Sequence, residues 1–251
     1  MDNPASLVSA HKHNSLGLRG SGMTHVGRVR RLNEDAILTD PLGVLWAVAD
    51  GMGGYGNGDV ASDIVIDCLS QMPDTGEPLR LLTSYLHTAN EKILARGAEL
   101  GTSQMGATAV AAVFEQGAVN IAWVGDSRAY LMRAAEFTAL THDHTVVQEL
   151  LDQGLIEIAD AKNHIEAHVV TRAVGAEPML DVDLVTVPIQ RGDRLILCSD
   201  GLTTCLSDAE IGRIARMTTA PEETCERLVR AALEAGAPDN VSVIAVFADA
   251  D

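Results

Sequence analysis

The sequence predicts an α+β fold in which antiparallel sheets carry helices on their outer faces. Two observations support this prediction: short apolar runs typical of strands come in clusters, and helical stretches come in pairs between those clusters. A regular alternation of strand and helix would instead indicate a parallel sheet. The chain has 251 residues, of which 47% are hydrophobic. This length and composition suit one domain with a substantial core.

Seven short runs rich in Val, Ile, Leu and Ala, each bounded by Gly, Asp or Pro, are expected to be buried strands. They are residues 44–49, 107–114, 119–124, 129–132, 183–187, 194–198 and 241–247.

Helices are predicted where apolar residues recur with helical spacing. Residues 59–72 and 78–97 each carry one apolar stripe. Ser207 and Glu210 form a capping box that opens a helix ending near residue 217. A last helix, 221–235, begins with proline and is followed by glycine, the usual asymmetry of helix ends.

Residues 1–20 are polar and aperiodic and are expected to form a flexible tail ahead of a single domain over 21–251. His11 and His13 in this tail are expected to be solvated and not bound to metal. The four cysteines show no C-x-x-C spacing, so reduced and mostly buried thiols are expected. The chain begins without a signal-peptide pattern, and no apolar run reaches the roughly 18 residues that span a bilayer. A cytoplasmic protein is therefore predicted.

Acidic residues outnumber basic ones by 35 to 18, which gives a formal net charge of −17. A field of this sign repels nucleic acid and anionic membranes and attracts cations. Neither nucleic acid nor a membrane is therefore an expected partner. Most of the excess charge can serve solubility alone, so the positions of particular aspartates are more informative.

Acids lie beside predicted strands at five positions. These are Glu34–Asp35, Asp50, Asp126, Asp200 and Asp239. A single acid of this kind indicates only a turn, but pairing of the strands could gather all five. Clustered carboxylates repel one another, and a hard divalent cation relieves the repulsion. Because all the donors are oxygens, they favour Mg²⁺, Mn²⁺ or Ca²⁺ over zinc or copper. One Asp that bridges two ions would create a two-metal site for phosphoryl chemistry.

Eight short segments, in a fixed order, carry a resemblance to a known family. They are RRLNED (30–35), VADGMGG (48–54), GATA (106–109), WVGDSRAY (123–130), LTHDH (140–144), TRAVG (171–175), CSDGL (198–202) and PDNVS (238–242). In this order they closely resemble the metal-dependent, type 2C protein serine/threonine phosphatases (the PPM family) in their bacterial form. The matches run from about residue 22 to 247, so the resemblance covers nearly the whole chain.

The resemblance implies a four-layer α-β-β-α sandwich, with two antiparallel sheets flanked by helix pairs. It also implies hydrolysis of phosphoserine and phosphothreonine in proteins, by direct attack of a metal-bridging hydroxide. Two central Mn²⁺ or Mg²⁺ ions and a third, weaker one are the expected cofactors. Residues 145–168 correspond to a flap that lies beside the active site and helps to select substrates.

The resemblance also implies roles for individual residues at the first ion. Asp50 would bridge the two central ions, and the Gly51 carbonyl would complete one ion site. Glu34 or Asp35 would reach that side mainly through water.

At the remaining ions, Asp200 and Asp239 would bind the second central ion, and Asp126 would join Asp200 at the third. Arg30 would hold the substrate phosphate with its planar fork of donors. Arg30, Asp50, Asp200 and Asp239 are thus the expected catalytic residues.

The sequence does not identify the group that protonates the leaving alkoxide. Met52 occupies the position of a histidine that is a candidate for this role in eukaryotic relatives, and a metal-bound water is the first candidate here. His142 and His144 are expected to be structural. His164 and His168 could face the substrate groove, although structural packing is the expected role for both.

Two alternative functions stay open. One is a catalytically inactive relative that binds phosphoproteins or a kinase, and the other is a hydrolase of another phosphate ester. An inactive copy would usually have lost a ligand acid or the arginine, and none is lost here. The expected partners are phosphorylated proteins and a cognate serine/threonine kinase, and the expected state is a monomer.

Overall fold

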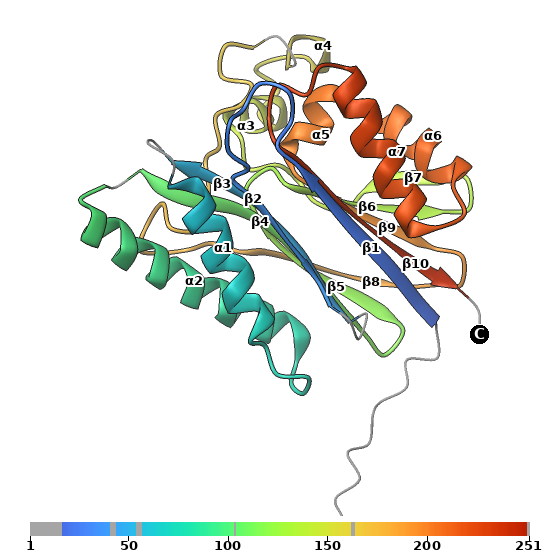
Figure 1. Ribbon diagram of the computed structural model, residues 1–251, viewed down its shortest axis with the longest axis horizontal. Helices are drawn as coiled ribbons and strands as arrows, with labels where there is room; N and C mark the ends of the chain where they lie inside the picture. Colours follow the sequence, from blue (N-terminus) through green and yellow to red (C-terminus); the bar gives the residue numbers. More distant parts are fainter. Residues whose placement is uncertain (1–16, 41–43, 54–56, 103, 162–163, 250–251) are drawn as a thin grey trace, which may run out of the picture.

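The computed structural model describes residues 17–40, 44–53, 57–102, 104–161 and 164–249. Two five-stranded antiparallel sheets lie face to face, and helices cover the outer face of each (Figure 1). This architecture confirms the predicted four-layer α-β-β-α sandwich.

The first sheet has the strand order β2-β3-β4-β5-β8. Its strands are β2 (Asp35–Thr39), β3 (Leu45–Gly53), β4 (Met105–Glu115), β5 (Ala118–Val124) and β8 (Asp183–Pro188). Helices α1 (Gly58–Ser70) and α2 (Pro78–Leu100) cover it. Helix α2 begins at a proline and ends at Gly101, whose φ of 69° is left-handed and favours glycine. Alanines of β3 and β4 share one buried cluster with these helices, so the helices can lie close to the sheet.

The second sheet has the order β1-β10-β9-β6-β7. Its strands are β1 (Gly17–His25), β6 (Arg128–Arg133), β7 (Glu136–Ala139), β9 (Arg194–Cys198) and β10 (Val241–Asp249). It is covered by α5 (Asp200–Cys205), α6 (Asp208–Met217) and α7 (Pro221–Glu234). The predicted capping box of Ser207 and Glu210 is present at the start of α6.

A third buried cluster fills the space between the sheets. In it, the Trp46 ring of β3 lies against the backbone of β1 at Gly20. A Cβ atom at Gly20 would lie 2.3 Å from that ring. Gly20 is therefore needed for the two sheets to close over Trp46.

The structure corrects several predicted boundaries. Strand β1 begins at Gly17, so residues 17–20 belong to a strand and not to the predicted tail. Residues 1–16, with His11 and His13, lie outside the described residues. Strand β3 does not end at residue 49 but continues to Gly53, because Asp50 to Gly53 stay paired with β4. The predictions also missed β2, β7 and α5.

The segment predicted as a flap contains α3 (Val146–Asp152) and α4 (Ile158–Ala161). It lies at the same end of the sandwich as the β1–β2 loop, at the top of Figure 1. Val147 is its one buried residue within the two helices, so the flap packs only lightly on the body.

Two further expectations concern the cysteines and the membrane. All four cysteines are free thiols and three are buried, which confirms that prediction. Within the described ranges, none of the helices has the length and apolar character needed to cross a bilayer.

Candidate metal centre

Asp35 and Asp50 lie opposite each other in the β2–β3 ladder. One Asp35 oxygen, Oδ2, accepts hydrogen bonds from the hydroxyls of Ser199, at 2.8 Å, and Ser242, at 2.7 Å. Ser199 follows β9 and Ser242 lies in β10, so Asp35 joins the two sheets. Its other oxygen, Oδ1, is buried without a hydrogen-bond partner. Burying such an oxygen is unfavourable unless a cation or water meets it.

Three more aspartates approach from other elements. Asp126 follows β5, Asp200 is the first residue of α5, and Asp239 precedes β10. The charges of Asp35 and of these three aspartates all act on Asp50. The structure thus brings all five predicted aspartates into one cluster.

Burial and mutual repulsion shift the titration of these carboxyl groups. Burial, and then the charge of Asp200, raises the pKa of Asp126 to about 8. Burial raises the pKa of Asp35 to about 6, against the effect of its two serine hydrogen bonds. Burial, and then the charges of Asp35 and Asp200, raises the pKa of Asp50 well above its ordinary value. A divalent cation among these groups would reverse the shifts, because it favours the ionised form.

Gly51 and Gly201 allow backbones to approach closely beside these acids. A Cβ at Gly51 would lie 2.0 Å from the Gly58 carbonyl oxygen, and a Cβ at Gly201 would lie 1.8 Å from the Asn240 carbonyl oxygen. The start of α1 therefore packs on β3 next to Asp50, and α5 packs on the segment that leads into β10. The two Asp-Gly pairs, which resemble turn signals in the sequence, mark tight packing beside the acids.

Glu34 and Asp35 have different surroundings. Glu34 Oε1 accepts a hydrogen bond from the Gly58 amide at 3.2 Å, so it holds the start of α1. Asp35 is the one of the two that lies opposite Asp50. Of the two predicted alternatives, Asp35 is therefore the closer to the centre of the cluster.

Arg30 reaches the edge of the cluster from the β1–β2 loop. Its Nη2 donates a hydrogen bond to Asp239 Oδ2 at 2.7 Å, and its side chain is about half exposed. The hydrogen bond to Asp239 raises the pKa of Arg30. A permanently charged, solvent-accessible guanidinium next to the acids suits recognition of a phosphate.

Asn240 is a site residue that sequence reasoning missed. Its Oδ1 accepts a hydrogen bond from the Glu34 amide at 2.8 Å, and its Nδ2 donates to the carbonyls of Val26 and Leu32 at 2.9 Å each. Asn240 therefore ties the Arg30 loop to the start of β10. Its position directly after Asp239 was the only available signal.

His144 is structural, as predicted. Its Nδ1 accepts a hydrogen bond from the Gly125 amide at 3.0 Å, and its own amide donates to the Gly125 carbonyl at 3.0 Å. The buried ring also stacks on Trp123. These contacts fix the backbone directly before Asp126.

Three further histidines, at positions 142, 164 and 168, lie in or near the flap. His142 pairs with Asp152 of α3 at 2.7 Å, and the His164 ring accepts a hydrogen bond from a nearby backbone amide at 3.2 Å. His168, in contrast, is exposed, so it makes little of the packing that was expected for it.

The aspartate cluster fits hard divalent ions in its chemistry. Its donors are carboxylate oxygens from both sheets, and one of them lacks a partner. Among the described residues, no three His, Cys, Asp or Glu side chains stand in a ready-made metal arrangement. One contact bears on this, because Asp239 accepts a hydrogen bond from Arg30. An ion bound to Asp239 would compete with Arg30 for it.

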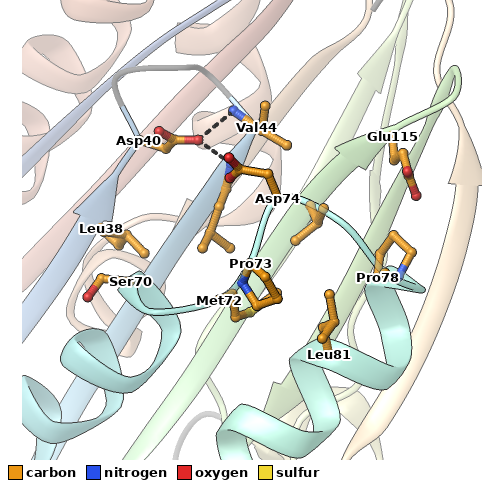
Figure 2. Close-up of a pocket in the computed structure, with 13 residues that line it drawn as sticks. Leu38, Asp40, Val44, Ser70, Met72, Pro73, Asp74, Pro78, Leu81 and Glu115 are labelled. Carbon is orange, nitrogen blue, oxygen red and sulfur yellow. Dashed lines mark hydrogen bonds between the residues drawn. The ribbon is translucent and has the colours of Figure 1, made fainter. Parts of the chain in front are cut away.

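A separate cavity of about 260 Å³ lies at the other end of β3, beside the end of α1 (Figure 2). Apolar residues such as Leu38, Met72 and Leu81 line it. At its rim, Asp40 accepts hydrogen bonds from the amides of Val44 and Leu45 at 3.1 and 3.2 Å. This carboxylate closes the β2–β3 connection, so the cavity is not assigned to the chemistry of the aspartate cluster.

Comparisons with known proteins agree with this geometry. The sequence pattern of a family described as protein phosphatase 2C matches residues 22–236. A serine/threonine phosphatase stp of Listeria innocua is 37% identical over 236 residues, which cover 89% of this chain and 93% of the relative. The structure of PppA, a key regulatory component of T6SS in Pseudomonas aeruginosa, is 36% identical with a TM-score of 0.86 and covers 94% of this chain and 100% of that one. The catalytic domain of the serine/threonine protein phosphatase PstP, in complex with two manganese ions, is 34% identical with a TM-score of 0.85, over 92% of this chain and 98% of that one.

Proposed function

This chain belongs to the protein phosphatase 2C family and is a metal-dependent serine/threonine protein phosphatase, and we propose that its aspartate cluster holds the divalent ions. The observation that supports this assignment is the setting of Asp50, which faces four other aspartates. In the same cluster, one buried oxygen of Asp35 has no partner. Carboxylates in such a setting need a cation to stay ionised.

Each acid receives a role that follows from its position. Asp50, at the centre, would be shared by two ions, and the adjacent Gly51 carbonyl would be a further donor to one of them. Asp200 and Asp239 would hold the second ion, and Asp126 with Asp200 would hold a third, weaker one. Mn²⁺ and Mg²⁺ are both suited to this set of oxygen donors. When bound, the ions supply a hydroxide nucleophile at neutral pH and neutralise charge on the phosphoryl oxygens.

Glu34 and Asp35 complete this side of the centre in different ways. Glu34 positions the start of α1 through the Gly58 amide. Asp35, held by two serine hydroxyls, orients a water molecule on the side of Asp50 with its free oxygen.

Arg30 binds the phosphate of the substrate. It lies at the exposed edge of the cluster, where a phosphoryl group can meet both the guanidinium and the ions. Its planar donors suit two phosphoryl oxygens and stabilise the charge that develops on them.

The nucleophile comes from water and not from a cysteine. Burial raises the pKa of the Cys198 thiol to about 12 and that of Cys225 to about 12. Such thiols stay protonated at neutral pH and are poor nucleophiles. These thiols therefore do not compete with water, and the proposed reaction is direct displacement at phosphorus without a phosphoenzyme.

The substrates are phosphorylated proteins, and the natural counterpart is a serine/threonine kinase that modifies the same proteins. The enzyme acts in the cytoplasm as a monomer. The inactive alternative finds no support, because the relatives are named as phosphatases and every assigned acid and Arg30 are present.

Activity on p-nitrophenyl phosphate, a phosphothreonine peptide and a phosphotyrosine peptide, each with and without Mn²⁺, tests the proposal. We expect Mn²⁺-dependent hydrolysis of the first two, little of the third, and loss of activity in excess chelator. Full activity in excess chelator would exclude a divalent-ion mechanism.

A further inference from the structure

Large apolar side chains exposed to solvent gather on the flap. Leu155, Ile158 and Ile165 are 64%, 85% and 96% exposed. A second pair, Val29 and Leu32, is 70% and 57% exposed and flanks Arg30 in the β1–β2 loop. Single exposed apolar residues are ordinary on protein surfaces, but a group of them around one site marks an interaction surface.

The two elements that carry these apolar groups both reach the aspartate cluster. The β1–β2 loop contacts it through Arg30, which donates a hydrogen bond to Asp239 at 2.7 Å. The flap begins directly after His144, whose amide donates a hydrogen bond at 3.0 Å to the carbonyl of Gly125, the residue before Asp126. Both elements stand at the same end of the sandwich (Figure 1). A peptide whose phosphate is held by Arg30 and the cluster would therefore run between the two apolar groups.

Acidic residues on the flap limit which side chains can flank the phosphoresidue of a bound peptide. Glu157, Asp160 and Glu166 are exposed on the flap among its apolar residues. Together with the aspartate cluster, they repel acidic side chains that flank a phosphoresidue. Aliphatic flanking side chains would instead pack on the apolar groups and be removed from water. This transfer is favourable in proportion to the apolar area that is buried.

We propose that this apolar rim, formed by Val29, Leu32, Leu155, Ile158 and Ile165, selects phosphoserine or phosphothreonine segments whose neighbouring residues are aliphatic and not acidic. The inference rests on the proposed function, because the phosphate anchors the segment between the two sides of the rim. It concerns the residues next to the phosphoresidue and leaves the phosphoryl chemistry unchanged.

Three phosphothreonine peptides of equal length test the inference on the Mn²⁺-loaded full chain. They differ only in the residues flanking phosphothreonine, which are Leu and Val, Ser and Gln, or Asp and Glu. The expected kcat/KM is highest for the aliphatic peptide, roughly tenfold lower for the polar one, and lowest for the acidic one.

Variants then locate the selectivity. The triple variant Leu155→Ser, Ile158→Ser, Ile165→Ser should lower kcat/KM for the aliphatic peptide to that of the polar one, with p-nitrophenyl phosphate hydrolysis unchanged. The matched control is Leu100→Ser with Met217→Ser, which changes exposed apolar residues at the ends of α2 and α6. This control should keep the full preference.

The outcomes separate the inference from the proposed function. Equal rates on the three peptides, or an undiminished preference in the triple variant, would overturn the inference while Mn²⁺-dependent p-nitrophenyl phosphate hydrolysis still supports the phosphatase. A change from dimer to monomer in the triple variant, measured by light scattering, would instead assign the rim to contact between copies. If the triple variant loses all activity, the pair Val29→Ser and Leu32→Ser decides by the same peptide comparison.

Discussion

Aspartates lie at both ends of strands β2 and β9, and their hydrogen-bond partners differ between the two ends. Before β9, the carboxylate of Asp193 accepts hydrogen bonds from Arg133 Nε at 3.0 Å, Arg133 Nη2 at 2.6 Å and the Gln190 amide at 2.8 Å. After β2, Asp40 accepts two backbone amides that close the β2–β3 connection. The acids at this end are satisfied by the chain itself.

At the opposite end of the same strands, Asp35 and Asp200 lie among other acids. Asp35 keeps one buried oxygen without a partner, and the main charges that act on Asp50 are those of four other aspartates. Acids with internal partners stabilise the fold, whereas acids that face acids destabilise the bare fold and serve an external cation. The difference between the two ends distinguishes structural from functional carboxylates.

The largest expected effect is on catalysis at the cluster end. Asp50→Asn, and likewise Asp239→Asn, should lower kcat by at least about 100-fold, because the ions generate the nucleophile. The metal-free Asp50→Asn protein should melt at the same temperature as the wild type or higher, since one repelling charge is gone. Steady-state kinetics measures kcat, metal analysis measures the bound ions, and thermal melts measure the melting temperature. Near-normal turnover with normal metal content would refute the ligand assignment.

The matched change at the opposite end should affect stability and not catalysis. Asp193→Asn leaves Arg133 without its ionic partner and should cost about 2–3 kcal/mol, less than a fully buried pair because Arg133 is partly exposed. This corresponds to a fall of roughly 5–10 °C in melting temperature. The folded variant should keep wild-type kcat at low temperature. A melting temperature equal to that of the wild type would remove the contrast between the two ends.

Arg30→Ala tests the cation at the edge of the cluster. It should chiefly raise KM for a phosphopeptide, by about tenfold, because it removes a charge-assisted contact to phosphate. Kinetics over a wide range of substrate concentrations, at saturating Mn²⁺, separates KM from kcat. A change confined to kcat would contradict a role in ground-state binding.

The smallest effect is expected at the third ion. Asp126→Ala should slow turnover several-fold and weaken one ion while the central pair stays bound, because only Asp200 is shared between them. A Mn²⁺ titration followed by calorimetry, with activity measured at each concentration, reports both quantities. Loss of every ion in this variant would refute the division into central and third sites.

The sequence predicted the layers and the acids of the cluster because both depend on local patterns. Apolar runs predicted seven of the strands, with members in both sheets, and β9 was predicted with its exact boundaries. The flap helix α3 follows Thr145, whose side chain caps it, in the segment predicted from the family resemblance.

The remaining features depend on contacts between distant segments. Strand β1 is rich in glycine and polar residues; it pairs with β10, and its Gly20 leaves room for the Trp46 ring of the other sheet. Strand β3 passes its Asp-Gly pair because β4 continues beside it. Asn240 acts through partners more than 200 positions away, which no local pattern reveals.

The most direct test of the account is a crystal structure grown with Mn²⁺, with the ions located by their anomalous scattering. The account predicts two strong peaks between Asp50, Asp200 and Asp239, and a weaker one near Asp126. Side chains of these aspartates that point apart, with no anomalous peak among them, would contradict it.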